Sequence, residues 1–131
     1  MLSSDFLEHV AERLDAVLAE QVRVLRSGGL LGFETVNRTW QARVVLIWLA
    51  QGVLRVAPPH LHDARWFIRP VVLTTRLAGL GVRVEELRGL VPARSPAGFL
   101  AGYLVRRESG GFRLGDDMRI SYLGYGLKVE A

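Results

Sequence analysis

The sequence predicts one α+β domain over residues 1–131, with an antiparallel sheet of about five strands and two to three helices. Three observations predict this fold class. Apolar residues follow helical spacing near the N-terminus, strand-like alternation begins after residue 30, and glycine or proline separates the later segments. Together they give the order α-β-β-β-α-(β)-α-β-β, and no repeat or linker divides the chain.

The first predicted helix runs from about Asp5 to about Arg26. Asp5 and Glu8 have the spacing of a capping box, and Gly28-Gly29 favours a stop after the last turn. Apolar residues recur every three or four positions, as one face of a helix requires: Leu7, Val10, Leu14, Val17, Leu18, Val24 and Leu25.

Residues 30–57 are predicted to form a three-stranded antiparallel meander, with turns at Asn37-Arg38 and Gln51-Gly52. Pro58-Pro59 then ends the sheet, because proline cannot donate a hydrogen bond to a ladder. The central strand is indicated by residues that alternate with their neighbours: Trp40, Ala42, Val44, Leu46 and Trp48.

Two further helices are predicted, one over Pro70–Leu80 and one that begins after Ser95. Pro70 is acceptable as the first residue of a helix, and Gly81 favours its end before a short strand over 82–85. Ser95 suits the N-cap of the last helix, and Pro96 suits its first position.

Two C-terminal strands are predicted at about 111–115 and 118–129, joined by a turn at Gly115-Asp116-Asp117. Adjacent residues of an extended chain point to opposite faces. We therefore interpret Asp116 and Asp117 as turn residues rather than as a catalytic carboxylate pair.

The composition excludes several classes of protein. The chain contains no cysteine, which removes thiol nucleophiles, thiolate zinc sites and disulfide scaffolds, and 50% hydrophobic residues exclude disorder. The longest apolar run, residues 44–50, is far shorter than the roughly 20 residues of a membrane helix, and no export signal precedes it. We expect a cytoplasmic protein with no membrane partner.

Positive charge is concentrated in the middle of the chain. The formal net charge is +4, and residues 36–113 contain 12 basic and 4 acidic residues. Guanidinium groups beside aromatic rings could stack on bases, so nucleic-acid binding is one alternative function. The candidate binding residues are Arg65, Arg69, Arg106, Arg107 and Arg113.

The sharpest local cluster of ligand-type residues is His60-Leu61-His62-Asp63, which suggests a metal-dependent enzyme as a second alternative. A catalytic metal site commonly requires about three protein ligands, and no third ligand is apparent from the spacing. The favoured interpretation is a surface histidine pair, with Asp63 capping a helical turn. We assign no metal, no cofactor and no catalytic residue, and we predict no tightly held stoichiometric metal.

The leading hypothesis is a small non-catalytic cytoplasmic protein that acts by association, and not an enzyme. The sequence contains no complete catalytic motif and no glycine-rich phosphate loop. Its apolar content exceeds that of a typical soluble domain, which favours a homo-oligomer, with a twofold dimer as the commonest solution. A second protein is the other expected partner.

Overall fold

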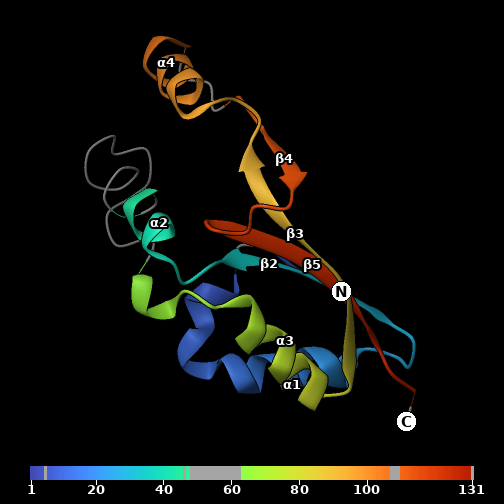
Figure 1. The fold of residues 1–131 in the computed structure, drawn as a ribbon. Coiled ribbons are helices and arrows are strands. Elements are labelled where there is room, and N and C mark those ends of the chain that lie inside the picture. The colour runs from blue at the N-terminus through green and yellow to red at the C-terminus, as the bar shows by residue number, and fades with distance from the viewer. Residues whose placement is uncertain (5, 46, 48–62, 107–109, 131) are drawn as a thin grey trace.

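The computed structural model describes residues 1–4, 6–45, 47, 63–106 and 110–130. Its five-stranded sheet has the order β1-β2-β5-β3-β4 (Figure 1). The strands are β1 (Leu2–Ser3), β2 (Leu30–Val36), β3 (Val82–Pro92), β4 (Phe112–Gly115) and β5 (Ser121–Lys128). The helices are η1 (Leu7–Arg13), α1 (Leu14–Val24), α2 (Trp40–Ala42), η3 (Ala64–Trp66), α3 (Pro70–Gly79) and α4 (Pro96–Arg106).

The sheet is mixed, so the prediction of a purely antiparallel sheet is wrong. β1 pairs with β2 in parallel, with Leu2 opposite Gly32. β5 runs antiparallel to both β2 and β3, which makes β2 and β3 parallel to each other with β5 between them. The prediction of two to three helices is also wrong, because four α-helices are present in the described part of the chain. The broader α+β class holds.

The main core lies between the sheet and the helices η1, α1 and α3, which lie together against one side of it (Figure 1). Tyr122 is fully buried in this core, and its hydroxyl donates to the carbonyl of Ile68 at 2.9 Å. The other buried members are Leu7, Leu14, Leu18, Val22, Leu31, Phe33, Ile68, Leu73, Leu77 and Val82.

The N-terminal helix is not continuous, in contrast to the prediction of one helix from Asp5 to Arg26. Val10, inside the 3₁₀ segment η1, has a non-helical backbone (φ −118°, ψ 19°), and so does Arg13 (φ −120°, ψ 20°), which separates η1 from the α-helix α1. The end of α1 is stabilised from the far end of the chain. The Lys128 ammonium donates to the carbonyls of Val22 and Leu25, both at 2.8 Å.

Residues 40–42 are helical, so the predicted central strand of the meander is wrong where the structure describes it. Thr39 caps this helix, because its hydroxyl accepts a hydrogen bond from the Ala42 amide at 3.1 Å. A run that is apolar on both faces fits a buried helix as well as a strand, and alternation alone does not distinguish them. The rest of the predicted meander, 48–57, lies outside the described residues.

The helix that begins with Pro70 is confirmed, with proline in its first turn. The strand after it is much longer than the predicted 82–85, because β3 extends to Pro92. Its register shifts between Val84 and Glu86, where a bulge interrupts the pairing with β5.

The helix that begins with Pro96 is also confirmed, and the Ser95 hydroxyl accepts from the Gly98 amide at 3.1 Å. The two C-terminal strands exist, but they are not paired with each other. β3 lies between them, pairing with β4 through Gly89–Pro92 and with β5 along most of its length. No helix in the described part of the chain is long and apolar enough to cross a membrane.

Candidate functional site at the carboxyl ends of the parallel strands

Polar side chains gather where the parallel strands β1 and β2 end. Ser4 follows β1 directly, and its hydroxyl donates to the Glu34 carboxylate at 2.5 Å. Asn37 follows β2 at the same end of the sheet. In open α/β sheets, ligands bind in the crevice outside the carboxyl ends of parallel strands. This end of the sheet is therefore the candidate functional site.

Glu8 is the buried charged residue of this region. It lies in η1, just after β1, and only 3% of its surface is exposed. The buried Thr35 hydroxyl of β2 donates to its Oε2 atom at 2.8 Å. Burial, and to a lesser extent the charge of Glu8, raise the pKa of Tyr122 far above its usual value. The phenol therefore stays protonated as the donor to Ile68, which joins β5 to the segment before α3, and the Glu8–Thr35 hydrogen bond ties η1 to β2.

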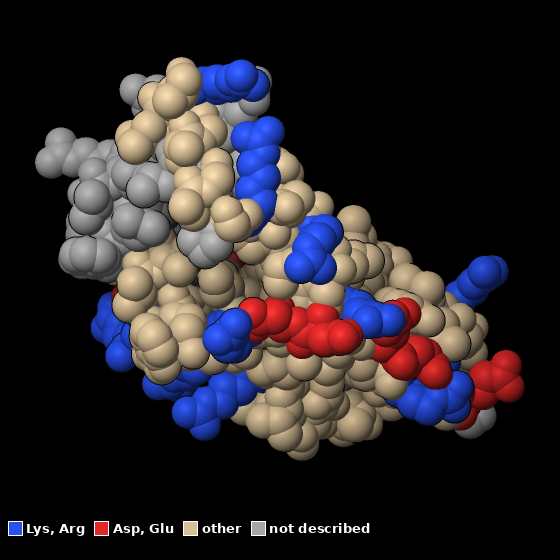
Figure 2. Space-filling view, turned by 45° about the horizontal axis from the view of Figure 1, so that its top comes forward, with Lys and Arg blue, Asp and Glu red and all other residues tan. Residues whose placement is uncertain are grey.

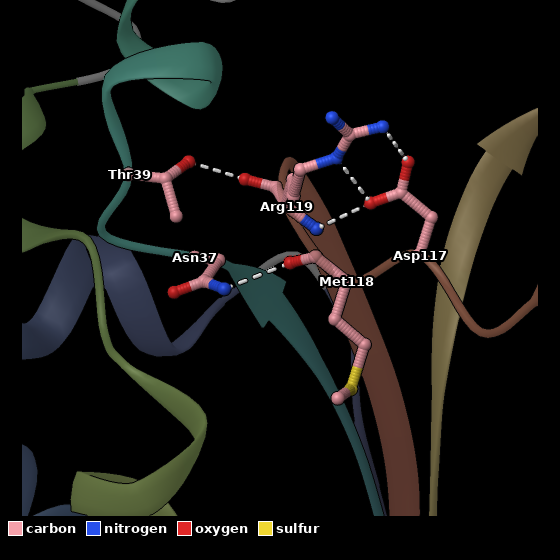
Figure 3. Close-up of polar contacts among 5 residues, drawn as sticks. All are labelled: Asn37, Thr39, Asp117, Met118 and Arg119. Carbon is pink, nitrogen blue, oxygen red and sulfur yellow. Dashed lines mark hydrogen bonds and ion pairs between the residues drawn. The ribbon is translucent and has the colours of Figure 1, made fainter.

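The end of β2 is fastened to the segment that leads into β5 (Figure 3). The Asn37 side-chain amide donates to the carbonyl of Met118 at 2.8 Å, and the Thr39 hydroxyl donates to the carbonyl of Arg119. Asn37 also donates its backbone N–H to Ile120 at 2.8 Å. The polar residues after β2 therefore fix the turn before β5.

Asp117 closes this turn by binding Arg119 (Figure 3). Its Oδ1 atom accepts from the Arg119 side chain at 2.9 Å and from the Arg119 backbone N–H at 3.0 Å. Its Oδ2 atom accepts from the Arg119 Nη2 atom at 2.7 Å. These hydrogen bonds, the side-chain ones above all, lower the pKa of Asp117 to about 2. The predicted turn role of Asp117 agrees with this geometry.

We expect Asp117 to titrate near pH 2 and the variant Arg119→Ala to return its pKa toward the ordinary value of about 3.9. Because the folded-state pKa is depressed, the pair stabilises the fold above the unfolded-state pKa, and this contribution disappears as the pH falls toward 2. Carboxyl chemical shifts followed by NMR against pH measure both values. Arg88→Ala, which removes the partner of the neighbouring Asp116, is the control and should leave Asp117 unchanged.

Two adjoining pockets lie beside η1 and η3; the larger one also reaches α3, and the smaller one reaches α1. The larger encloses about 450 Å³ and the smaller about 360 Å³, and both are lined by Ala11 and Trp66. Four arginines line the larger pocket: Arg38, Arg65, Arg69 and Arg76. Neither pocket is lined by a residue of β1 or β2.

The structure does not bring together the four described arginines among the five that the sequence singled out. Arg65 and Arg69 line the larger pocket, whereas Arg106 lies on α4 and Arg113 on the edge strand β4, and neither of them lines it (Figure 1). Arg107 lies outside the described residues. Basic side chains are spread over several parts of the face in Figure 2, and acidic side chains lie between some of them. Arg38 and Arg76, which complete the pocket, come from separate segments and carried no sequence signal.

The histidine pair that suggested a metal enzyme, His60 and His62, lies outside the described residues. Asp63 caps η3, as the favoured interpretation required, because its carboxylate accepts from the Arg65 amide at 2.9 Å. Hydrogen bonds from the Arg65 side chain, and then from its backbone, lower the pKa of Asp63 to about 2. Within the described ranges, no three His, Asp or Glu side chains are placed to hold a metal ion.

No family model matches the chain, but individual proteins do. It is 35% identical over 126 residues to a ubiquinone biosynthesis O-methyltransferase of Nitrosococcus oceani, a match that covers 96% of this chain and 48% of the relative. A protein of the same name from Agrobacterium fabrum is 31% identical over 123 residues, and this match covers 94% of the present chain and 44% of the relative. The chain thus spans about half the length of the curated relatives it matches.

Solved structures resemble the fold over nearly the whole chain. A SAM-dependent methyltransferase from Thermotoga maritima superposes with a TM-score of 0.57 at 18% identity, covering 97% of this chain and 54% of that one. A SAM-dependent methyltransferase from Methanosarcina mazei also superposes with a TM-score of 0.57, at 11% identity. That superposition covers 99% of this chain and 58% of the other. The chain therefore has a methyltransferase-like fold, and it corresponds to a little over half of each of these two solved chains.

These similarities overturn the leading hypothesis from the sequence. The relatives carry the names of enzymes, so the prediction of a non-catalytic protein that acts by association is wrong, and so is the prediction that the chain is not enzymatic. The buried polar contact that sequence reasoning missed joins Glu8 and Thr35. Glu8 was assigned only to a helix cap, and its burial against β2 depends on strand pairing that no local pattern indicates.

Proposed function

We propose that this chain forms one half of an O-methyltransferase, an enzyme that transfers a methyl group to a hydroxyl oxygen. The observation that carries the proposal is the 35% identity with a ubiquinone biosynthesis O-methyltransferase along 96% of the chain. The fold supports it, because the chain superposes on two SAM-dependent methyltransferases with a TM-score of 0.57.

The described residues do not by themselves fit a site for S-adenosylmethionine, the methyl donor of SAM-dependent enzymes. No residue of β1 or β2 lines either of the two pockets described above, and the sequence has no glycine-rich turn after a strand that would bring a nucleotide close to the backbone. We therefore assign no residue of this chain to the donor. The relatives contain about as much sequence again beyond the match, and we infer that the donor site lies in that part of the enzyme.

The chain's own contribution is the carboxyl end of β1 and β2. We assign Glu8 a positioning role, because its carboxylate joins η1 to Thr35 at this end of the sheet. Losing that contact would displace the segment that follows β1. A displacement of about 1 Å near reacting groups can cost about 10²-fold in rate.

A chimera tests the proposal. The matched segment of the Nitrosococcus oceani relative is replaced by these 131 residues, and methyl transfer from labelled S-adenosylmethionine is measured with the relative's own acceptor. We expect transfer well above background, and a loss of about 10²-fold in the chimera with Glu8→Gln. Glu12→Gln, which changes an exposed carboxylate of the same segment, is the matched control and should keep the activity.

Two outcomes would contradict the proposal. The first is a folded chimera that binds S-adenosylmethionine but transfers no methyl group. The second is transfer by the 131-residue chain alone, which would place the donor site within it. The predicted cytoplasmic location and the predicted homodimer remain predictions beside this proposal.

A further inference from the structure

We propose that the larger pocket between η1, η3 and α3, here named the arginine pocket, binds a small phosphate monoester that carries a flat ring. It is lined by Arg38, Arg65, Arg69 and Arg76 together with Trp66 and apolar side chains. Its volume of about 450 Å³ falls in the usual range for small-molecule sites, about 300–1,000 Å³. The inference is independent of methyl transfer, because it concerns different residues.

The charges in the arginine pocket are only partly neutralised. Arg76 pairs with Asp15 at 3.0 Å, and Arg65 pairs with Asp63 at 2.6 Å. Asp63 chiefly, and Glu12 weakly, raise the pKa of Arg65.

Arg38 and Arg69 have no ion pair within the part of the chain that the structure describes, and no lining residue is acidic. Each guanidinium carries five N–H donors and no acceptor. Two sets of donors therefore remain available at one concave site, which favours an anionic ligand.

A phosphate group suits these donors better than a carboxylate does. A guanidinium binds two oxygens at once in a planar fork, and a phosphate offers three oxygens to two such forks. Arg69 also stands immediately before α3, whose first turn contains no acidic residue and whose N-cap side chain makes no hydrogen bond. The positive end of this helix adds to the attraction for an anion.

The remaining lining explains why the ligand should carry a ring. Leu14, Phe67 and Ile68 form a buried apolar part of the wall. Trp66 adds an aromatic surface, and the Arg65 guanidinium lies 5.5 Å from the centre of its ring. A bare phosphate would leave this apolar surface in contact with water, whereas an attached ring would cover it.

Titration of the full chain with three probes tests the proposal: phenyl phosphate, inorganic phosphate and phenol. We expect phenyl phosphate to saturate a single site and to shift the Trp66 indole signal in NMR spectra. Inorganic phosphate should bind the same site more weakly, and phenol should show no saturation. No saturable binding of phenyl phosphate would overturn the proposal.

Two double variants separate the arginine pocket from general positive charge. Arg38→Gln with Arg69→Gln should weaken phenyl phosphate binding by at least about tenfold, since it removes charge-assisted hydrogen bonds. Arg106→Gln with Arg113→Gln removes the same charge from α4 and β4 and should change the affinity by less than about twofold, as expected for solvent-screened charges that do not line the pocket. Equal losses in the two variants would overturn the proposal.

A single variant tests the ring preference. Trp66→Leu should reduce the affinity for phenyl phosphate toward that for inorganic phosphate, because the aromatic surface is removed while the arginines remain. An unchanged preference for phenyl phosphate would overturn the assignment of the ring. Circular dichroism verifies that every variant keeps its fold.

Discussion

Replacing Gly124 with alanine is expected to destabilise the protein by about 3 kcal/mol, because the added methyl group has no space in the middle of the sheet. A Cβ atom at this position would lie 2.4 Å from the Glu86 carbonyl oxygen of β3 and 2.7 Å from a Leu87 methyl group. It would also lie 3.1 Å from the ring of Phe33 on β2. To relieve these close contacts, β5 would have to move away from both of its neighbouring strands.

The measurement is urea denaturation of Gly124→Ala beside a matched glycine variant. Gly79 lies in the last turn of α3, and a Cβ atom there meets nothing within 4 Å. Gly79→Ala should leave stability unchanged or raise it by up to about 1 kcal/mol, because alanine favours the helix more than glycine does. If Gly124→Ala proved as stable as Gly79→Ala, the sheet would have space for a Cβ atom at position 124, and the expectation would be wrong.

Phe33→Ala is expected to cost about 3–5 kcal/mol, the usual range when a buried phenylalanine is truncated. Only 2% of Phe33 is exposed, and its ring packs in the main core and over the backbone of Gly124. Its removal leaves a cavity between two layers, and the sheet cannot collapse into that space without breaking its pairing with β5.

Phe112→Ala provides the comparison for Phe33→Ala, because it deletes the same atoms from a residue that is 56% exposed on the edge strand β4. That variant should stay within about 0.5 kcal/mol of the wild type. Urea midpoints measured at a common pH give both values. Equal losses for Phe33→Ala and Phe112→Ala would place Phe33 outside the core that stabilises the fold.

The sequence was informative where the signal was local. Pro70 and Ser95 marked the starts of α3 and α4 correctly, because capping and proline geometry depend on a few neighbouring residues. Glu85 falls at the bulge of β3 and breaks the alternation there, so the pattern indicated only the first few residues of an 11-residue strand.

Long-range pairing carried no such signal. β1 has only two residues, and its parallel pairing with β2 depends on a partner 30 residues away. The candidate site and the arginine pocket were missed for the same reason, because their residues are far apart in the sequence. Glu8 and Thr35 meet only once β1 and β2 pair, and Arg38 and Arg76 reach one pocket only through the packing of α3 near η1. Composition and spacing describe neither arrangement, so they led to a non-catalytic interpretation.

The position of β5 has a consequence for how the chain is made. The strand that lies between β2 and β3 is the last of the five in sequence order. During synthesis on the ribosome, β2 and β3 therefore emerge without the partner that each of them needs. Until residues 121–128 have left the exit tunnel, both strands present unpaired edges and exposed apolar faces, a state prone to aggregation.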